Sequence, residues 1–236
     1  MFNPFKKTYD QKGSYIPISK VEPSSIISEQ YRKLRTNIEL SNFNQELKVI
    51  GITSTNAMEG KTITSINLAV VYAQSKKKTL LIDMDLRKPK LHRGFDLLNK
   101  VGLSDIITDN LAYSDVIQKV DDHLFVLSAG TKLPYPSEFL TSHKLEELIS
   151  KLKKEYDRII IDTPPMTAVA DASIISSLCD GMMIVIASRE TDVSLTKDAL
   201  KDLRDNGAFI IGTVLTRVSR KDSRYMNYYY YAYKQD

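Results

Sequence analysis

Apolar residues occur along this chain in two patterns, short continuous runs and longer amphipathic stretches. The continuous runs are rich in Ile, Val and Leu, which is typical of strands that are buried on both faces of a sheet. They predict six strands, at residues 48–53, 79–83, 124–127, 158–162, 182–187 and 209–215.

Amphipathic stretches lie between these runs and predict helices. The clearest covers residues 61–75, where apolar side chains recur on one helical face. Two more are predicted at 145–156 and at 193–206, the second of which is ended by Gly207. Strands that alternate with helices indicate an α/β fold with a doubly wound, mostly parallel sheet, in which ligands bind at the carboxyl ends of the strands.

Composition divides the chain into three parts. Residues 1–23 carry one glycine and three prolines without sustained periodicity, and predict a flexible or docked arm. Residues 24–216 hold all the predicted strands and helices and are expected to form one domain. Residues 217–236 turn basic and then tyrosine-rich, and are predicted to be a tail.

Charge and cysteine content exclude several classes of protein. The 236 residues include 33 basic and 29 acidic side chains, and this small excess does not argue for a nucleic-acid partner. The single cysteine, Cys179, excludes an internal disulfide and fits a reducing compartment. The polar N-terminus lacks a signal peptide, and the apolar runs are far shorter than the ~18 residues of a membrane span. We therefore expect a soluble, cytoplasmic protein that reaches any membrane through a partner.

The first predicted strand leads into the sequence TSTNAMEGKT, residues 53–62. A strand, a loop that ends in Gly-Lys-Thr and an amphipathic helix are the context of a phosphate-binding loop. Gly60 would let the backbone approach the phosphates, Lys61 would bridge the β- and γ-phosphates, and the Thr62 hydroxyl would bind Mg²⁺. The predicted nucleotide-binding residues are Thr55, Asn56, Ala57, Met58, Glu59, Gly60, Lys61, Thr62 and Ile63.

This loop departs from the strict phosphate-loop pattern. Thr55 stands where the first glycine belongs, so an ordinary strand-to-helix turn is an alternative interpretation. Ala57 is tolerable because backbone amides contact the phosphates. Met58 would cost roughly 1 kcal/mol or more if its position needs a positive φ. We expect nucleotide binding to survive both departures.

Two later strands end in carboxylates. The sequence LLIDMDLRKP places Asp83 and Asp85 two residues apart at a strand end, and RIIIDTPP places Asp162 at another. Because parallel strands carry their carboxyl ends to one edge, we expect these side chains to lie beside the phosphate loop. Carboxylates there can hold a metal ion and accept the proton of an incoming hydroxyl. A single strand-end Asp is more often a cap or turn residue, but three in this order favour a site.

Together these three segments resemble the Walker A, Walker A′ and Walker B motifs of bacterial P-loop tyrosine kinases, the autokinases of capsular and exopolysaccharide export systems. The segment SAGTKLPYPSEFL, residues 128–140, is similar to that family's Gly-x-x-Pro-x-x-Pro-x-Glu-Leu stretch. The resemblance runs from about Ser28 to the C-terminus.

The resemblance implies a role for each motif residue. Lys61 would contact the phosphates of ATP, while Thr62, Asp85 and Asp162 would hold Mg²⁺. Asp83 would take the proton from the attacking tyrosine, whose pKa near 10 makes the phenol a poor nucleophile at neutral pH. The assignment of Asp83 rather than Asp85 as the base rests on the family and not on spacing.

The C-terminal tail concentrates tyrosines next to this predicted kinase site. Six of the 13 tyrosines lie within nine residues, which favours a phosphorylation substrate over a packing strand or a carbohydrate-binding surface. Several phosphates would make the basic tail acidic. The predicted phosphoacceptors are Tyr225, Tyr228, Tyr229, Tyr230, Tyr231 and Tyr233.

An ExxRxxR sequence near the start, formed by Glu29, Arg32 and Arg35, places three charges on one helical face. The spacing alone favours a solvated face with local ion pairs. The resemblance implies instead a contact between subunits in a ring, which would bring the tail of one subunit to the active site of the next.

The resemblance also implies partners. These are a membrane-spanning activator or chain-length regulator, whose cytoplasmic segment completes the nucleotide site at the inner face of the plasma membrane, and a cognate tyrosine phosphatase. Two other classes of protein remain as alternatives. One is a deviant-Walker ATPase of the partition or septum-positioning kind, which needs an additional lysine that residues 53–60 lack. The other is a non-catalytic adaptor, against which the intact motif residues argue.

Overall fold

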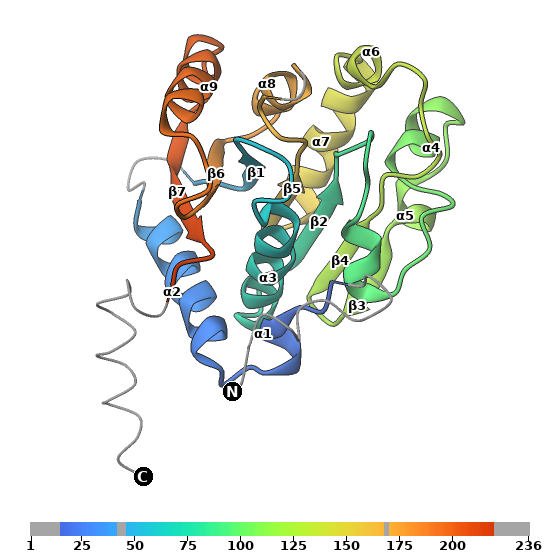
Figure 1. The fold of residues 1–236 in the computed structure, drawn as a ribbon. Helices are drawn as coiled ribbons and strands as arrows, with labels where there is room; N and C mark the ends of the chain where they lie inside the picture. Colours follow the sequence, from blue (N-terminus) through green and yellow to red (C-terminus); the bar gives the residue numbers. More distant parts are fainter. Residues whose placement is uncertain (1–14, 42–45, 168–169, 220–236) are drawn as a thin grey trace.

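One seven-stranded sheet forms the centre of the computed structural model, which describes residues 15–41, 46–167 and 170–219 (Figure 1). The strands follow the spatial order β3-β4-β2-β5-β1-β6-β7. Their bounds are β1 (Val49–Ser54), β2 (Thr79–Asp83), β3 (Gln118–Asp121), β4 (Leu124–Leu127), β5 (Arg158–Asp162), β6 (Gly181–Ala187) and β7 (Ile210–Thr216).

The predicted mostly parallel sheet is confirmed. All six predicted strands are present within one residue at either end, and they pair in parallel. The sequence prediction missed β3, which runs antiparallel to β4 at the edge of the sheet. Its alternate residues are exposed and it carries a single valine, so it lacks the continuous apolar signal of the buried strands.

Helices connect the strands. The three helices predicted from periodicity correspond to α3, α7 and α9. The sequence analysis gave no bounds for α2, a 15-residue helix that carries the ExxRxxR sequence, and the remaining helices are too short to show a period. The helices are α1 (Ile18–Val21), α2 (Ile26–Leu40), α3 (Lys61–Gln74), α4 (Leu103–Thr108), α5 (Tyr113–Val116), α6 (Pro136–Leu140), α7 (His143–Glu155), α8 (Asp171–Ser176) and α9 (Val193–Asp205), with a 3₁₀ helix η2 (Leu91–Phe95).

Both faces of the sheet are covered, as Figure 1 shows. Helices α2 and α3 pack with η2 on one face, against Leu81 and Ile160. On the other face α4 to α8 pack against Leu80, Ile82 and Ile161. Helix α9 packs against the side chains of β6. Neighbouring residues of one strand therefore pack into the cores on opposite faces of the sheet. Both sets must be apolar, which explains the continuous apolar runs. This layering leaves the carboxyl ends of β1, β2 and β5 together at one edge.

The described end of the N-terminal arm is docked on α3. Ile18 and Ser19 are buried, and the Ser19 backbone N–H donates to Asn67 Oδ1 at 2.9 Å. Gln74 Nε2 donates to the Ser19 carbonyl at 2.8 Å. Across the described ranges, no helix combines the length and the apolar content that crossing a membrane requires.

Candidate active site

The loop between β1 and α3 has the backbone geometry that phosphate binding needs. Gly60 adopts a left-handed conformation with φ 98°, immediately before Lys61 begins α3. Met58 also has a positive φ, 68°, and its side chain is 77% exposed. The condition under which this methionine costs conformational energy is thus met. The amides at the start of α3 and the positive end of the helix dipole favour an anion at this point.

Glu59 fastens this loop to the ends of two other strands. Its carboxylate is buried and accepts hydrogen bonds from the Asn56 backbone N–H at 3.0 Å and the Thr191 hydroxyl at 2.6 Å. The Glu59 carbonyl accepts from the Thr216 hydroxyl at 2.7 Å, at the end of β7. Arg217 Nη2 donates to the Met58 carbonyl at 2.5 Å. The loop conformation is therefore set by contacts that the motif itself does not contain.

Lys61 lies among the strand-end carboxylates. Its Nζ is 2.9 Å from Asp85 Oδ2 and 3.8 Å from Asp162 Oδ2. Burial opposes the charged form of the lysine, but the charges of Asp162 and Asp85 outweigh it and raise the pKa of Lys61. The ammonium group of Lys61 therefore stays charged at the end of the phosphate loop. The charged form is the one that binds phosphate oxygens.

Asp162, at the end of β5, is bound by the first turn of α3. The Thr62 hydroxyl donates to its Oδ2 at 2.7 Å and the Ser65 hydroxyl donates to its Oδ1 at 3.0 Å. Burial raises the pKa of Asp162, although Lys61 and the two hydroxyl groups favour its charged form. The sequence analysis did not identify Ser65, which lies one helical turn after Lys61 on the same face.

Asp83 is the most enclosed of the three carboxylates, with 0% exposure. Its Oδ1 accepts from the Asp85 N–H at 3.2 Å, and its Oδ2 accepts from the N–H groups of Lys90 and Leu91 at 3.1 and 3.0 Å. Burial, together with the charge of Asp162, raises the pKa of Asp83 to about 7. This residue therefore holds the segment after β2 in place, besides any part that it takes in chemistry.

The residues present fit a magnesium-bound nucleotide. Thr62, Asp85 and Asp162 offer hydroxyl and carboxylate oxygens, the hard donors that Mg²⁺ prefers. Among the described residues no group of three His, Cys, Asp or Glu side chains is arranged to hold a metal ion by itself. Mg²⁺ commonly takes one or two protein carboxylates, and completes its shell with phosphate oxygens and water.

Arg87 links the site to two more distant helices. Its Nε donates to Asp171 Oδ2 at 2.8 Å, and its Nη2 donates to Asp171 Oδ1 at 3.2 Å and Ser137 Oγ at 3.1 Å. Asp171 is the first residue of α8 and is 1% exposed. Sequence reasoning missed this network, because nothing in the chain indicates that residues 84 positions apart meet.

The ExxRxxR residues make contacts within the chain. Arg32 Nη2 pairs with Glu29 Oε1 at 2.5 Å, and Arg35 Nη1 donates to the Val71 carbonyl of α3 at 2.7 Å. Arg35 thus joins α2 to α3. No partner chain is present, so the subunit contact stays a prediction. The six predicted phosphoacceptor tyrosines lie outside the described residues.

A phosphate loop at the start of a helix, with strand-end carboxylates beside it on a parallel sheet, defines a P-loop nucleotide-binding protein. The AAA domain family matches residues 47–203. The chain is 40% identical over 220 residues to the tyrosine-protein kinase YwqD of Bacillus subtilis, covering 93% of this chain and 92% of that protein. The putative tyrosine-protein kinase CapB of Staphylococcus aureus is 42% identical over 212 residues, covering 89% and 92%. The chain belongs to the bacterial tyrosine-protein kinase family.

Solved structures agree with this assignment. The chimerical protein CapA2B2 superposes with a TM-score of 0.83 at 34% identity, covering 91% of this chain and 99% of that chain. A plasmid partition protein from Borrelia burgdorferi, which represents the alternative class, reaches a TM-score of only 0.62 at 24% identity, covering 78% and 85%. That second likeness shows the fold alone. The findings therefore favour the kinase over the partition-type ATPase.

Proposed function

We propose that this protein is an ATP-dependent protein-tyrosine kinase that phosphorylates the tyrosine cluster of its own C-terminal tail, between subunits. The observation that carries the proposal is the cluster of Lys61, Asp85 and Asp162 at the mouth of the phosphate loop, in a chain that belongs to a tyrosine-kinase family. The tail supplies the acceptor, because six tyrosines lie in its last 12 residues.

Each residue of the site has a part in the proposed transfer. The loop amides and Lys61 hold the β- and γ-phosphates, and Thr62, Asp85 and Asp162 hold Mg²⁺, which when bound neutralises charge on the transferring phosphoryl group. Lys61, which contacts Asp85 and Asp162 in the structure, would bind the phosphates instead when the nucleotide is present.

The proton of the acceptor tyrosine hydroxyl goes to a carboxylate at the end of β2. The tyrosine oxygen forms a bond to the γ-phosphorus, the bond from that phosphorus to the β–γ bridging oxygen breaks, and ADP leaves. We assign the proton to Asp83. Its pKa of about 7 suits a base at neutral pH, and its Oδ1 accepts a single backbone hydrogen bond, which leaves a lone pair for the proton.

The names of the relatives support a setting for this activity. YwqD and CapB are named tyrosine-protein kinases, and one further relative is described as a putative kinase of a Klebsiella pneumoniae cps region. We infer that this chain regulates capsular or exopolysaccharide production. We also propose that it works at the inner face of the plasma membrane, through a membrane-spanning activator, and that a cognate phosphatase reverses the modification.

Incubation of the purified protein with Mg-ATP, followed by mapping of phosphotyrosine by mass spectrometry, tests the proposal. We expect phosphate on residues 225–233, and none in a Lys61→Met variant, since that variant lacks the phosphate-binding ammonium group. ATP hydrolysis without phosphotyrosine, also in the presence of an activator's cytoplasmic segment, would favour the partition-type ATPase instead.

A further inference from the structure

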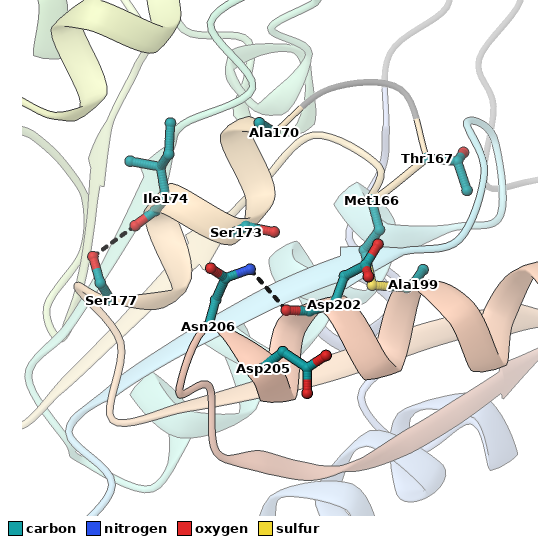
Figure 2. Close-up of a pocket in the computed structure, with 10 residues that line it drawn as sticks. All are labelled: Met166, Thr167, Ala170, Ser173, Ile174, Ser177, Ala199, Asp202, Asp205 and Asn206. Atoms are coloured by element: carbon teal, nitrogen blue, oxygen red, sulfur yellow. Dashed lines mark hydrogen bonds between the residues drawn. The ribbon is translucent and has the colours of Figure 1, made fainter.

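A groove of about 810 Å³ lies between α8 and α9, outside the site described above (Figure 2). Its lining combines the apolar side chains of Met166, Ile174 and Ala199 with hydroxyl groups and the carboxylates of Asp202 and Asp205. Six of its ten described lining residues are polar, so the groove suits a hydrophilic peptide segment.

The charge of this groove has one sign. Asp202 and Asp205 are exposed, and neither carboxylate is bonded to another side chain within the described residues. Lys201 precedes Asp205 by one helical turn, but the structure shows no ion pair between these two described residues, and none of Lys197, Lys201 and Arg204 lines the groove. The described lining contains no basic side chain, so the groove favours a cationic ligand.

The groove is continuous with the catalytic edge of the sheet. Thr167, which lines its upper end, donates through its hydroxyl to the carbonyl of Thr55 in the phosphate loop at 2.7 Å. The wall formed by α8 begins at Asp171, the partner of Arg87 in the segment after β2. A peptide in the groove would therefore leave it next to the phosphate loop.

The chain itself contains a segment with the matching chemistry. Residues 220–236 carry four basic against two acidic side chains. Three of the basic ones, Arg220, Lys221 and Arg224, directly precede Tyr225. Thr191, just before α9, bonds Glu59 of the phosphate loop, and Asp202 lies nine residues after the start of that helix, which is roughly 14 Å along its axis. An extended segment advances about 3.3 Å per residue, so roughly four to five residues span this length.

We propose that the groove between α8 and α9 docks the basic start of the C-terminal tail of a second copy and presents its tyrosines to the active site. Arg220, Lys221 and Arg224 pair with Asp202 and Asp205. This inference rests on the proposed tyrosine-kinase function. Each phosphate added to the tail brings about −1.5 to −2 charges. Because the groove is acidic, the phosphorylated tail is repelled from it and the product leaves.

The test separates docking from catalysis by using two full-length chains. The enzyme chain carries its six tail tyrosines as Phe, and the substrate chain carries Lys61→Met with an intact tail. Initial rates against substrate concentration give KM and kcat. With Asp202→Asn/Asp205→Asn in the enzyme chain, we expect KM for the substrate chain to rise roughly three- to tenfold, as two exposed charge pairs imply, with kcat and ATP hydrolysis unchanged.

Two further chains sharpen the result. Asp122→Asn removes an exposed carboxylate at the β3–β4 turn, away from the groove, and should leave KM unchanged. Arg220→Gln/Lys221→Gln/Arg224→Gln in the substrate chain should raise KM by itself, and should add little to the effect of the groove variant, because the two sets of changes remove the same contacts.

The outcomes distinguish the two proposals. If the parent enzyme chain leaves the substrate chain unlabelled, the proposed transfer between subunits fails, and the docking inference fails with it. If the parent labels the substrate but the groove variant shows an unchanged KM, only the docking inference is overturned. A groove variant with an altered oligomeric state by light scattering would also overturn it, because the groove would then face a folded surface of another copy.

Discussion

At the scale of single residues, Met58 and Asp83 carry conformations or charges that cost stability at the site. Met58 has a φ of 68° and is 77% exposed, so its side chain gains little from packing. Asp83 is fully buried with a carboxylate that burial disfavours in its charged form. Met58 lies in the phosphate loop and Asp83 lies beside it, and strained conformations and shifted pKa values are common at functional sites of proteins.

Replacing Met58 with glycine should stabilise the protein. A left-handed conformation costs an ordinary residue roughly 1–2 kcal/mol, so we expect Met58→Gly to raise the free energy of unfolding by about 1 kcal/mol in urea denaturation. Leu98→Gly is the control, because Leu98 is similarly exposed, at 68%, and has a negative φ. That change should be neutral or destabilising. Equal effects of the two substitutions would contradict the assignment of strain to Met58.

The raised pKa of Asp83 predicts a pH dependence of stability in the nucleotide-free protein. Between its ordinary pKa of 3.8 and its folded pKa of about 7, the folded state binds a proton that the unfolded state has released. Stability therefore falls as the pH rises through this range. The raised pKa of Asp162 acts in the same direction.

Urea unfolding at about pH 5 and about pH 8, with metal removed, measures this dependence. The loss of stability on going to the higher pH should be smaller in Asp83→Asn than in the wild type. The comparison uses the slope with pH, since the amide also disturbs the bonds from Lys90 and Leu91. Asp122→Asn, at an exposed site, should keep the wild-type slope. The same slope in all three proteins would refute the shifted pKa.

At the scale of elements, the end of β7 contacts the phosphate loop, although the two are distant in sequence. Thr216 donates to the Glu59 carbonyl at 2.7 Å, and a β-carbon on Gly60 would come within 3.2 Å of Thr216 Cγ2. The loop therefore packs closely on β7 at the point where the tail begins. The nucleotide loop and the tail are thus joined through one strand end.

Thr216→Val should weaken ATP binding more than it slows chemistry. Loss of one hydrogen bond of about 1 kcal/mol predicts a rise of roughly fivefold in KM for ATP with kcat little changed. Thr216→Ser keeps the hydroxyl and should restore KM. Thr213→Val, at an exposed position of the same strand, is the matched control. A lowered melting temperature with KM unchanged in Thr216→Val would mean that the contact is merely structural.

The elements themselves could largely be predicted from the sequence, because the strands are buried on both faces and read as continuous apolar runs. The motif carboxylates could be placed at one edge for the same reason, since parallel strands deliver their ends together. The contacts of Glu59 with Thr191, and of Arg87 with Asp171, could not be foreseen. They join elements that only the sheet order brings side by side, and no local pattern records that order.

At the scale of the whole molecule, Arg35 belongs both to a contact within the chain and to the predicted subunit interface. It donates to the Val71 carbonyl and so holds α2 on α3, whereas Glu29 and Arg32 pair with each other at the surface. If the helix also contacts a second subunit, Glu29→Lys should reduce assembly and leave the free energy of unfolding nearly unchanged, because exposed pairs contribute little. Arg35→Ala should lower both. Light scattering and urea unfolding measure the two quantities, and an unchanged assembly in both variants would argue against this interface.

Transfer between subunits makes a further prediction about the whole molecule. The tail begins beside the phosphate loop of its own subunit, since Arg217 contacts Met58, so tethering alone does not prevent transfer within one chain. Transfer between chains depends on encounter or assembly, whereas transfer within a chain does not. Mixing a Lys61→Met chain that has its tail with an active chain whose six tail tyrosines are Phe isolates the first route. We expect phosphotyrosine on the Lys61→Met chain, at a rate that rises with the concentration of the active chain. Labelling that occurs in the wild type, at a rate independent of concentration, but never in the mixture would establish transfer within one chain, and the subunit contact would then serve another purpose.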